Sequence, residues 1–223
     1  MLVIVQARLS SSRLPGKVLK DLGGRPMLAW TLERVRAAKL VSKLVVATST
    51  QPDDDAVADF CAREGVTCHR GPLDNVAERF AIALRVEKAD AFLRITGDAP
   101  LIDPAVIDAA IALYRAGDWD LVSNVLVRSF PVGQSVEAVR GETFLKALAE
   151  MDDAGDREHV TQFLHKNRGR YRTVNFSSGA DAAAVQMSVD TPQDFASAQD
   201  LVVRSNGKPG GWRDLLALMQ ARA

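Results

Sequence analysis

The chain has few of the residues from which disulfide scaffolds and zinc sites are built. It contains two cysteines, Cys61 and Cys68, and three histidines among its 223 residues. The cysteines form no Cys-x-x-Cys pair, and no cluster of histidines stands near them. We therefore expect two buried thiols in a reducing compartment, rather than a disulfide framework or a structural zinc site.

Net charge and long apolar runs are also lacking. The 28 basic residues are balanced by 28 acidic residues, so neither nucleic acid nor an anionic membrane surface is an expected partner. The apolar run near the start of the chain, Leu2–Val5, is far shorter than a signal-peptide core or a membrane span. These absences predict a cytoplasmic globular protein that is long enough for one substantial domain.

That overall balance hides a local excess of positive charge. Residues 1–40 contain eight lysines and arginines but two acidic residues, which gives this segment a formal charge of +6. The segment starts with an apolar stretch typical of a strand, and a polar loop follows it directly. We expect an anionic ligand near this loop.

Apolar stretches of strand length alternate with amphipathic helical stretches through the first half of the sequence. Proline opens three of the helical stretches, where its missing N–H costs no hydrogen bond. The alternation predicts a parallel sheet covered by helices on both faces, with ligands bound at the carboxyl ends of the strands. The expected strands are Leu2–Ala7, Leu44–Thr48, Val66–His69, Ala91–Thr96 and Leu121–Val125, and the expected helices are Pro26–Ala38, Pro52–Glu64, Asp74–Val86 and Pro104–Arg115.

The second half is less regular, but it contains neither a repeat nor a domain linker. We expect a single domain over residues 1–223, with an irregular elaboration at about residues 126–180. The expected strands are Val136–Val139, Tyr171–Phe176 and Val185–Val189, and the expected helices are Glu142–Met151, Arg157–Asn167, Pro192–Arg204 and Trp212–Ala221.

The loop after the first expected strand has the composition of a triphosphate site. It brings cations and hydroxyl donors close together, and Pro15-Gly16 is expected to turn the chain. Neither a Walker A sequence nor a G-x-G-x-x-G sequence is present, so side chains would bind the phosphates. An exposed polar loop without a ligand is the alternative. The side chains concerned are those of Arg8, Ser10, Ser11, Ser12, Arg13 and Lys17.

Two aspartates are candidates for a magnesium site because each follows an expected strand. Asp98 comes after Gly97, and Asp190 comes just before a helix. Mg²⁺ is commonly held by one or two carboxylates together with substrate phosphates. A helix cap is the alternative for Asp190, whereas Asp103 and Asp194 are predicted to be helix-start residues.

Four further polar residues are candidates for the same site. Arg79 falls on an expected helix, where a surface arginine would be unremarkable. Glu137 interrupts an apolar strand and needs a partner if it is buried. Glu158 and His159 stand at the start of an expected helix and could face a substrate, although a lone histidine is as often structural.

The segment Gln6–Leu19 resembles the N-terminal signature of the SpsF-type, spore-coat-polysaccharide cytidylyltransferase-like proteins, which are relatives of the CMP-sialate and CMP-Kdo synthetases. The likeness continues through Arg94–Asp103 and Arg157–Thr161 and ends with Val189–Phe195, so it covers nearly the whole chain. It implies a three-layer Rossmann-like nucleotidyltransferase fold, that of the nucleotide-diphospho-sugar transferases, with a mostly parallel central sheet. It also implies a homodimer, with the elaboration at about residues 126–180 serving substrate binding or dimerisation.

The reaction implied by this resemblance transfers CMP from CTP to a sugar or sugar acid and releases pyrophosphate. Mg²⁺ would be the cofactor, and the product would enter the synthesis of a surface polysaccharide or glycoconjugate. Many relatives have an acidic residue where this chain has Val132, in the segment that would bind the sugar. Together, the residues themselves and this resemblance predict Ala7, Arg8, Ser10, Ser11, Ser12, Arg13, Lys17, Arg79 and Gly97 for the nucleotide, Asp98 and Asp190 for the metal, Glu137, Glu158 and His159 for the acceptor, and Arg13, Lys17 and Asp98 for catalysis.

Two other functions compete with this one. A glycosyltransferase that uses a preformed nucleotide-sugar would bind a diphosphate without releasing pyrophosphate, and its D-x-D motif would have to be Asp53–Asp55. That acidic run instead fits the first turn of a helix, where it complements the helix dipole. A non-catalytic nucleotide-binding module is the second alternative, and two separate strand-end aspartates argue against it.

Overall fold

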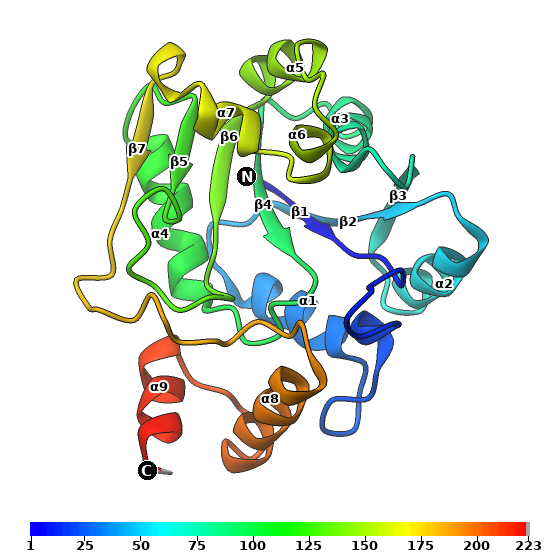
Figure 1. The fold of residues 1–223 in the computed structure, drawn as a ribbon, viewed down its shortest axis with the longest axis vertical. Helices are drawn as coiled ribbons and strands as arrows, with labels where there is room; N and C mark the ends of the chain where they lie inside the picture. Colours follow the sequence, from blue (N-terminus) through cyan, green and yellow to red (C-terminus); the bar gives the residue numbers. More distant parts are fainter. Residues whose placement is uncertain (222–223) are drawn as a thin grey trace.

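The structure, a computed structural model, describes residues 1–221 and arranges them around one seven-stranded sheet (Figure 1). The strand order is β3-β2-β1-β4-β6-β5-β7. The first four strands of this order pair in parallel, β6 runs antiparallel to both neighbours, and β5 pairs with β7 in parallel. The predicted mostly parallel sheet is confirmed. Its strands are β1 (Leu2–Gln6), β2 (Lys43–Ser49), β3 (Thr67–Gly71), β4 (Ala91–Thr96), β5 (Leu121–Ser123), β6 (Glu137–Arg140) and β7 (Thr173–Asn175).

Helices cover both faces of the sheet, as the alternation of elements predicts. One buried apolar cluster joins one face to α1, α2, α4, α8 and α9, and a second joins the other face to α3, α5 and α7. The helices are α1 (Met27–Ala37), α2 (Asp55–Arg63), α3 (Val76–Val86), α4 (Pro104–Arg115), α5 (Gly141–Ala149), α6 (Ala154–Glu158), α7 (Gln162–Lys166), α8 (Pro192–Arg204) and α9 (Trp212–Gln220). Single 3₁₀ turns occupy Lys17–Leu19, Pro52–Asp54 and Arg168–Arg170.

Strand β1 shows why the apolar runs are continuous rather than alternating. Val3 and Val5 enter the first cluster, whereas Leu2 and Ile4 enter the second. A parallel strand buried on both faces has no side that must be polar, so every position can be apolar.

No helix among residues 1–221 is both long and apolar enough to cross a membrane.

Two predicted elements of the second half are wrong. The helix expected over Arg157–Asn167 is broken between α6 and α7, because Val160 has a left-handed backbone with φ 54°. The strand expected over Val185–Val189 is irregular chain that makes only a single bridge, between Val132 and Gln186. Its hydrogen bonds join it to a loop rather than to a strand of the sheet.

Cys61 and Cys68 are both free thiols. Cys61 is buried in the core, whereas Cys68 is half-buried, which makes the prediction of two buried thiols right for one of them.

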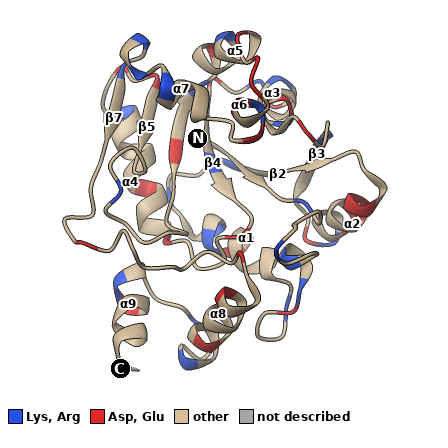
Figure 2. Cartoon of the chain, viewed as in Figure 1, with Lys and Arg blue, Asp and Glu red and all other residues tan. Residues whose placement is uncertain are grey.

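The carboxyl ends of β1 and β4 lie side by side, and the loops that follow them meet there. The N–H of Gly97 donates to the carbonyl of Gln6 at 2.8 Å. A Cβ atom on Gly97 would stand 2.9 Å from that same oxygen, so this close approach requires glycine. Figure 2 shows several lysines and arginines on the neighbouring loop between β1 and α1.

Candidate active site

A cavity of about 500 Å³ opens at this end of the sheet. The loop after β1, the end of β4, the start of α3, the C-terminal end of α6 and the segment before α8 all contribute to it. All nine residues predicted for the nucleotide line this cavity, together with Asp98, Asp190, Glu158 and His159. Segments far apart in the sequence therefore converge on one space, as the strand-end argument predicts.

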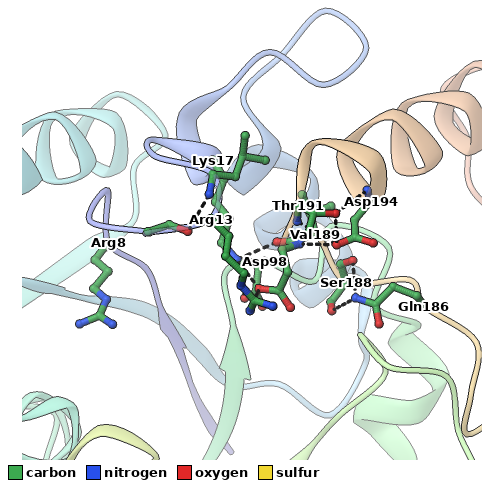
Figure 3. A network of polar contacts seen from close by, with 12 residues as sticks. Arg8, Arg13, Lys17, Asp98, Gln186, Ser188, Val189, Thr191 and Asp194 are labelled. Carbon is green, nitrogen blue, oxygen red and sulfur yellow. Dashed lines mark hydrogen bonds and ion pairs between the residues drawn. The ribbon is translucent and has the colours of Figure 1, made fainter.

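Lys17 lies at the centre of the polar contacts in the cavity (Figure 3). Its Nζ donates to Asp98 Oδ2 at 3.0 Å, to Asp190 Oδ1 at 2.9 Å and to the carbonyl oxygen of Val189 at 2.7 Å. Only 7% of the residue is exposed. Gly16, which precedes it with φ 70°, makes the predicted turn and directs Lys17 into the cavity.

Two arginines extend the positive charge to either side of Lys17. Arg13 pairs with Asp190 at 2.9 Å, and the Arg13 side chain remains 64% exposed. Arg8 pairs with Glu158 at 2.9 Å and lies apart from the contacts of Lys17 in Figure 3. The loop thus presents cations at two places along the cavity, a spacing suited to a ligand with several anionic groups.

Arg79 is buried without a partner for most of its guanidinium. The residue is 2% exposed, and its Nε and Nη1 atoms make no hydrogen bond. Burial, and after it the charge of Arg8, lowers the pKa of Arg79 to about 10, against the opposing effect of Asp54 and Glu158. Because Arg79 lines the cavity, an anionic or carbonyl group of a ligand would supply the missing acceptor. The resemblance implied such a role for it.

Asp54 supports the loop after β1 from behind. Its carboxylate accepts the N–H of Leu9 at 2.7 Å, and the N–H and hydroxyl of Ser49 donate to its other oxygen. The prediction that this acidic run stands in the first turn of a helix is confirmed, because Asp53 and Asp54 lie in the first turn of the 3₁₀ segment and Asp55 in the first turn of α2. Asp54 stands at the N-cap position of α2, but its side chain makes no cap hydrogen bond there.

Glu137 does not face the cavity, so the prediction that it contacts the acceptor is wrong. Its carboxylate is 3% exposed and accepts from Arg94 at 3.1 Å, Thr161 at 2.5 Å and Ser123 at 3.0 Å. His165 lies 2.6 Å from it through Nε2. Burial alone would raise the pKa of Glu137, but the hydrogen bond from His165, followed by the charges of Arg94 and His165, lowers it to about 2.

The cavity also contains residues that our reading of the sequence did not single out. Gln6, Arg94 and Thr96 line it, and Arg94 Nε donates to Gln6 Oε1 at 3.0 Å. Arg94 is therefore held by Gln6 on one side and by Glu137 on the other. Polar residues within or at the end of an apolar strand are the signal that would have identified them.

The predicted helix-start roles of two other aspartates are confirmed. Asp103 accepts from Ala105 N–H at 2.8 Å and from Trp212 N–H at 2.9 Å, so it also joins α9 to α4. Asp194 forms a capping box with Thr191 at the start of α8. Because Thr191 and Asp194 cap α8, the side chain of Asp190 is not used for the cap, and it contacts Lys17 and Arg13.

Comparison with known proteins places these residues in context. A family model described as cytidylyltransferase matches residues 2–208. The chain is 30% identical over 220 residues to the spore coat polysaccharide biosynthesis protein SpsF of Bacillus subtilis (strain 168), an alignment that covers 94% of this chain and 89% of that protein.

Two further proteins extend the comparison. A 3-deoxy-manno-octulosonate cytidylyltransferase of Saccharophagus degradans is 34% identical over 155 residues, which cover 69% of this chain and 58% of that protein. Among solved structures, a cytidylyltransferase of Leptospira borgpetersenii superimposes with a TM-score of 0.94 at 25% identity, covering 99% of this chain and 93% of that one.

Proposed function

The chain belongs to the cytidylyltransferase family and is a nucleotidyltransferase, and we propose that it transfers CMP from CTP to a hydroxyl of a sugar or sugar acid, with Mg²⁺ as cofactor and pyrophosphate as leaving group. The observation that carries this proposal is the contact of Lys17 Nζ with both Asp98 and Asp190 within 3.0 Å. Cations suited to a polyphosphate and carboxylates suited to a divalent ion thus meet at one point.

The donor groups around Lys17 fit a magnesium ion. Two carboxylates and the carbonyl of Val189 converge on one cationic nitrogen, and all three offer the hard oxygen atoms that Mg²⁺ prefers. Among residues 1–221 no group of three or more His, Cys, Asp or Glu side chains forms a metal cage. This agrees with an ion that takes its remaining ligands from substrate phosphates and water. Asp98 and Asp190 would hold it.

In this reaction the acceptor oxygen forms a bond to the α-phosphorus as the bond to the bridging oxygen of pyrophosphate breaks. When bound, Mg²⁺ would align the α-phosphate and lower the pKa of the attacking hydroxyl. Arg13 and Lys17 would hold the β- and γ-phosphates and offset the negative charge that develops on the leaving group. The serines of the loop, Ser10 to Ser12, would donate hydrogen bonds to phosphate oxygens. Catalysis then needs positioning and charge neutralisation, with no covalent nucleophile.

Two observations support the choice of acceptor: the names of the relatives and the polar residues that line the cavity. One relative is named for spore coat polysaccharide biosynthesis, and another for cytidylyl transfer to 3-deoxy-manno-octulosonate, a sugar acid. The cavity that contains the proposed phosphate-binding residues is also lined by the polar side chains of His159, Glu158 and Arg94. A sugar acid used in a surface polysaccharide or glycoconjugate is therefore the acceptor that we favour.

A homodimer and a cytoplasmic location complete the proposal. The dimer rests on the resemblance, and the location rests on the cysteine usage and the short apolar run at the start of the sequence. Light scattering of the purified protein across a range of concentrations tests the dimer. A mass equal to one chain at all concentrations would contradict it.

The experiment that tests the function is a pyrophosphate-release screen. The purified chain is incubated with Mg²⁺ and each of the four ribonucleoside triphosphates, against a panel of sugar acids and sugar phosphates. We expect release with CTP and a sugar acid, and a product whose mass equals the sugar plus CMP. A glycosyltransferase would instead consume a preformed nucleotide-sugar without releasing pyrophosphate. CTP binding without turnover on any acceptor would indicate a module that only binds the nucleotide.

A further inference from the structure

We propose that Lys17 occupies the position of the divalent ion in the ligand-free protein and leaves it only when a triphosphate arrives, so that metal and nucleotide bind as a coupled pair. The inference rests on the proposed function, because it concerns the same carboxylates. It goes beyond that function by predicting how the two ligands depend on each other.

The contacts of Lys17 are those of an ion bound in a small cage. An ammonium group has three N–H donors, and the acceptors on Asp98, Asp190 and Val189 lie 3.0, 2.9 and 2.7 Å from the nitrogen. The residue is 7% exposed, so few water molecules reach this nitrogen. The cage is therefore already filled by a cation that belongs to the protein.

Charge in this cage is balanced before any ligand binds. Asp98 and Asp190 contribute two negative charges, and Lys17 and Arg13 contribute two positive charges at 2.9–3.0 Å. A divalent ion that entered would stand beside Lys17 or displace it. Displacement without a new acceptor would leave a buried ammonium unpaired, which costs far more than an exposed one. We therefore expect the protein alone to bind divalent ions weakly.

A triphosphate supplies the acceptor that the displaced ammonium needs. The side chain of lysine is a flexible four-carbon stem that bears a point charge, so it can exchange one set of oxygens for another. The serines and arginines that would hold the phosphates lie on the same loop as Lys17 and line the same cavity. Phosphate oxygens would take the ammonium, and the two carboxylates would become available to the metal. By linkage, the nucleotide must raise the affinity for the metal by the same factor as the metal raises the affinity for the nucleotide.

The first test measures divalent-ion binding without nucleotide. Mn²⁺ is the probe, since it takes the same oxygen ligands as Mg²⁺ and its free form gives an electron paramagnetic resonance signal. We expect Lys17→Met to bind Mn²⁺ at least about tenfold more tightly than the wild type, a difference of ~1.4 kcal/mol. Lys20→Met is the matched control, because Lys20 lies three residues away, stacks on Phe195 and contacts neither aspartate. It should bind Mn²⁺ like the wild type.

Two further variants keep the test decisive. Lys17→Gln keeps an N–H donor while losing the charge, and it replaces Lys17→Met if the methionine variant does not fold. The double variant Lys17→Met with Asp98→Asn should lose the tightened Mn²⁺ binding, because one carboxylate of the cage is gone. Wild type that binds Mn²⁺ as tightly as the folded lysine variants would overturn the proposal.

The second test measures the coupling itself. Calorimetric titration of the wild type with CTP, first with EDTA and then with Mn²⁺, should show tighter CTP binding with the metal, and the factor should shrink in Lys17→Met. An equal factor in both proteins would count against the lysine. The outcome is separable from that of the proposed function: a chain that releases pyrophosphate from CTP but shows no gain of Mn²⁺ affinity in Lys17→Met loses this inference alone.

Discussion

The carboxylate of Asp54 accepts a hydrogen bond from the backbone N–H of Leu9 at 2.7 Å, although the two residues are 45 positions apart. Asp54 is 1% exposed, and Leu9 stands between Arg8 and the three serines of the loop. A residue that does not line the cavity thus fixes the backbone of the segment that would bind the phosphates. We regard Asp54 as a positioning residue for the phosphate-binding loop.

Asp54→Asn should therefore raise the KM for CTP about tenfold. The asparagine side chain keeps one oxygen acceptor, but its NH₂ group would face the backbone N–H of either Leu9 or Ser49, each of which donates to Asp54. A hydrogen bond to a charged group is worth ~1.5–3 kcal/mol. Steady-state kinetics measures the change, and the exposed neighbour variant Asp53→Asn should leave KM unaltered. A loss of thermal stability with an unchanged KM would mean that Asp54 serves only the fold.

Asp98→Ala should abolish Mg²⁺-dependent pyrophosphate release while the protein stays folded. The substitution removes one of two carboxylates that would hold the ion, and Asp98 is on a loop rather than in the buried core. Circular dichroism monitors the fold alongside the pyrophosphate assay. Retained turnover, or gross unfolding, would count against the metal role.

Lys17→Ala should slow the chemical step at least about tenfold, equivalent to ~1.4 kcal/mol of transition-state stabilisation. The truncated side chain can no longer offset charge on the departing pyrophosphate. Single-turnover measurements at saturating CTP separate this effect from weaker binding. An unchanged rate would remove this lysine from the mechanism.

Arg79→Met should weaken CTP binding at least about tenfold yet leave the ligand-free protein as stable as the wild type, or more stable. The methionine fills a similar volume, and it removes a buried guanidinium whose Nε and Nη1 have no acceptor. Calorimetry measures the affinity, and thermal unfolding without CTP measures the stability. A large drop in melting temperature would show that Arg79 contributes to the fold instead.

Glu137 should make the stability of the protein depend on acid pH. Its folded pKa of about 2 lies below the ordinary value of 4.5, so its stabilising contribution is complete above pH 4.5 and is lost as the pH falls toward 2. Glu137→Gln should cost about 3–5 kcal/mol at neutral pH, because it leaves Arg94 buried beside an uncharged group. Urea unfolding between pH 2 and 6 should show a flatter pH dependence for the variant. Parallel curves for the two proteins would contradict this assignment.

Elements with a strong local pattern were predictable from the sequence. The ranges Ala91–Thr96, Pro104–Arg115 and Pro192–Arg204 coincide with β4, α4 and α8, because an unbroken apolar run or a proline at the helix start marks each boundary. The break at Val160 was not predictable, since a valine with positive φ carries no sequence signal. Tertiary packing imposes that conformation.

The same distinction applies to the site. Asp98 and the loop cations stand at the carboxyl ends of strands, so the topology of a parallel sheet was enough to bring them together. The partners of Glu137 come from other elements, including His165, which is 28 residues away. No spacing rule connects them, and the strand position alone could not show whether Glu137 faces the cavity or the protein interior. Pairing of this kind is visible only in three dimensions.

Two of the oxygens around Lys17 Nζ belong to Val189 and Asp190, which lie 172 and 173 positions further along the chain. A nascent chain that has emerged only as far as α7 can form six of the seven strands, but it still lacks Asp190, one of the two carboxylates that would hold the metal, and the carbonyl of Val189. The site is therefore completed late in synthesis, when the residues after α7 fold back against the loop after β1. A protein truncated before Val189 should therefore have no pyrophosphate-releasing activity.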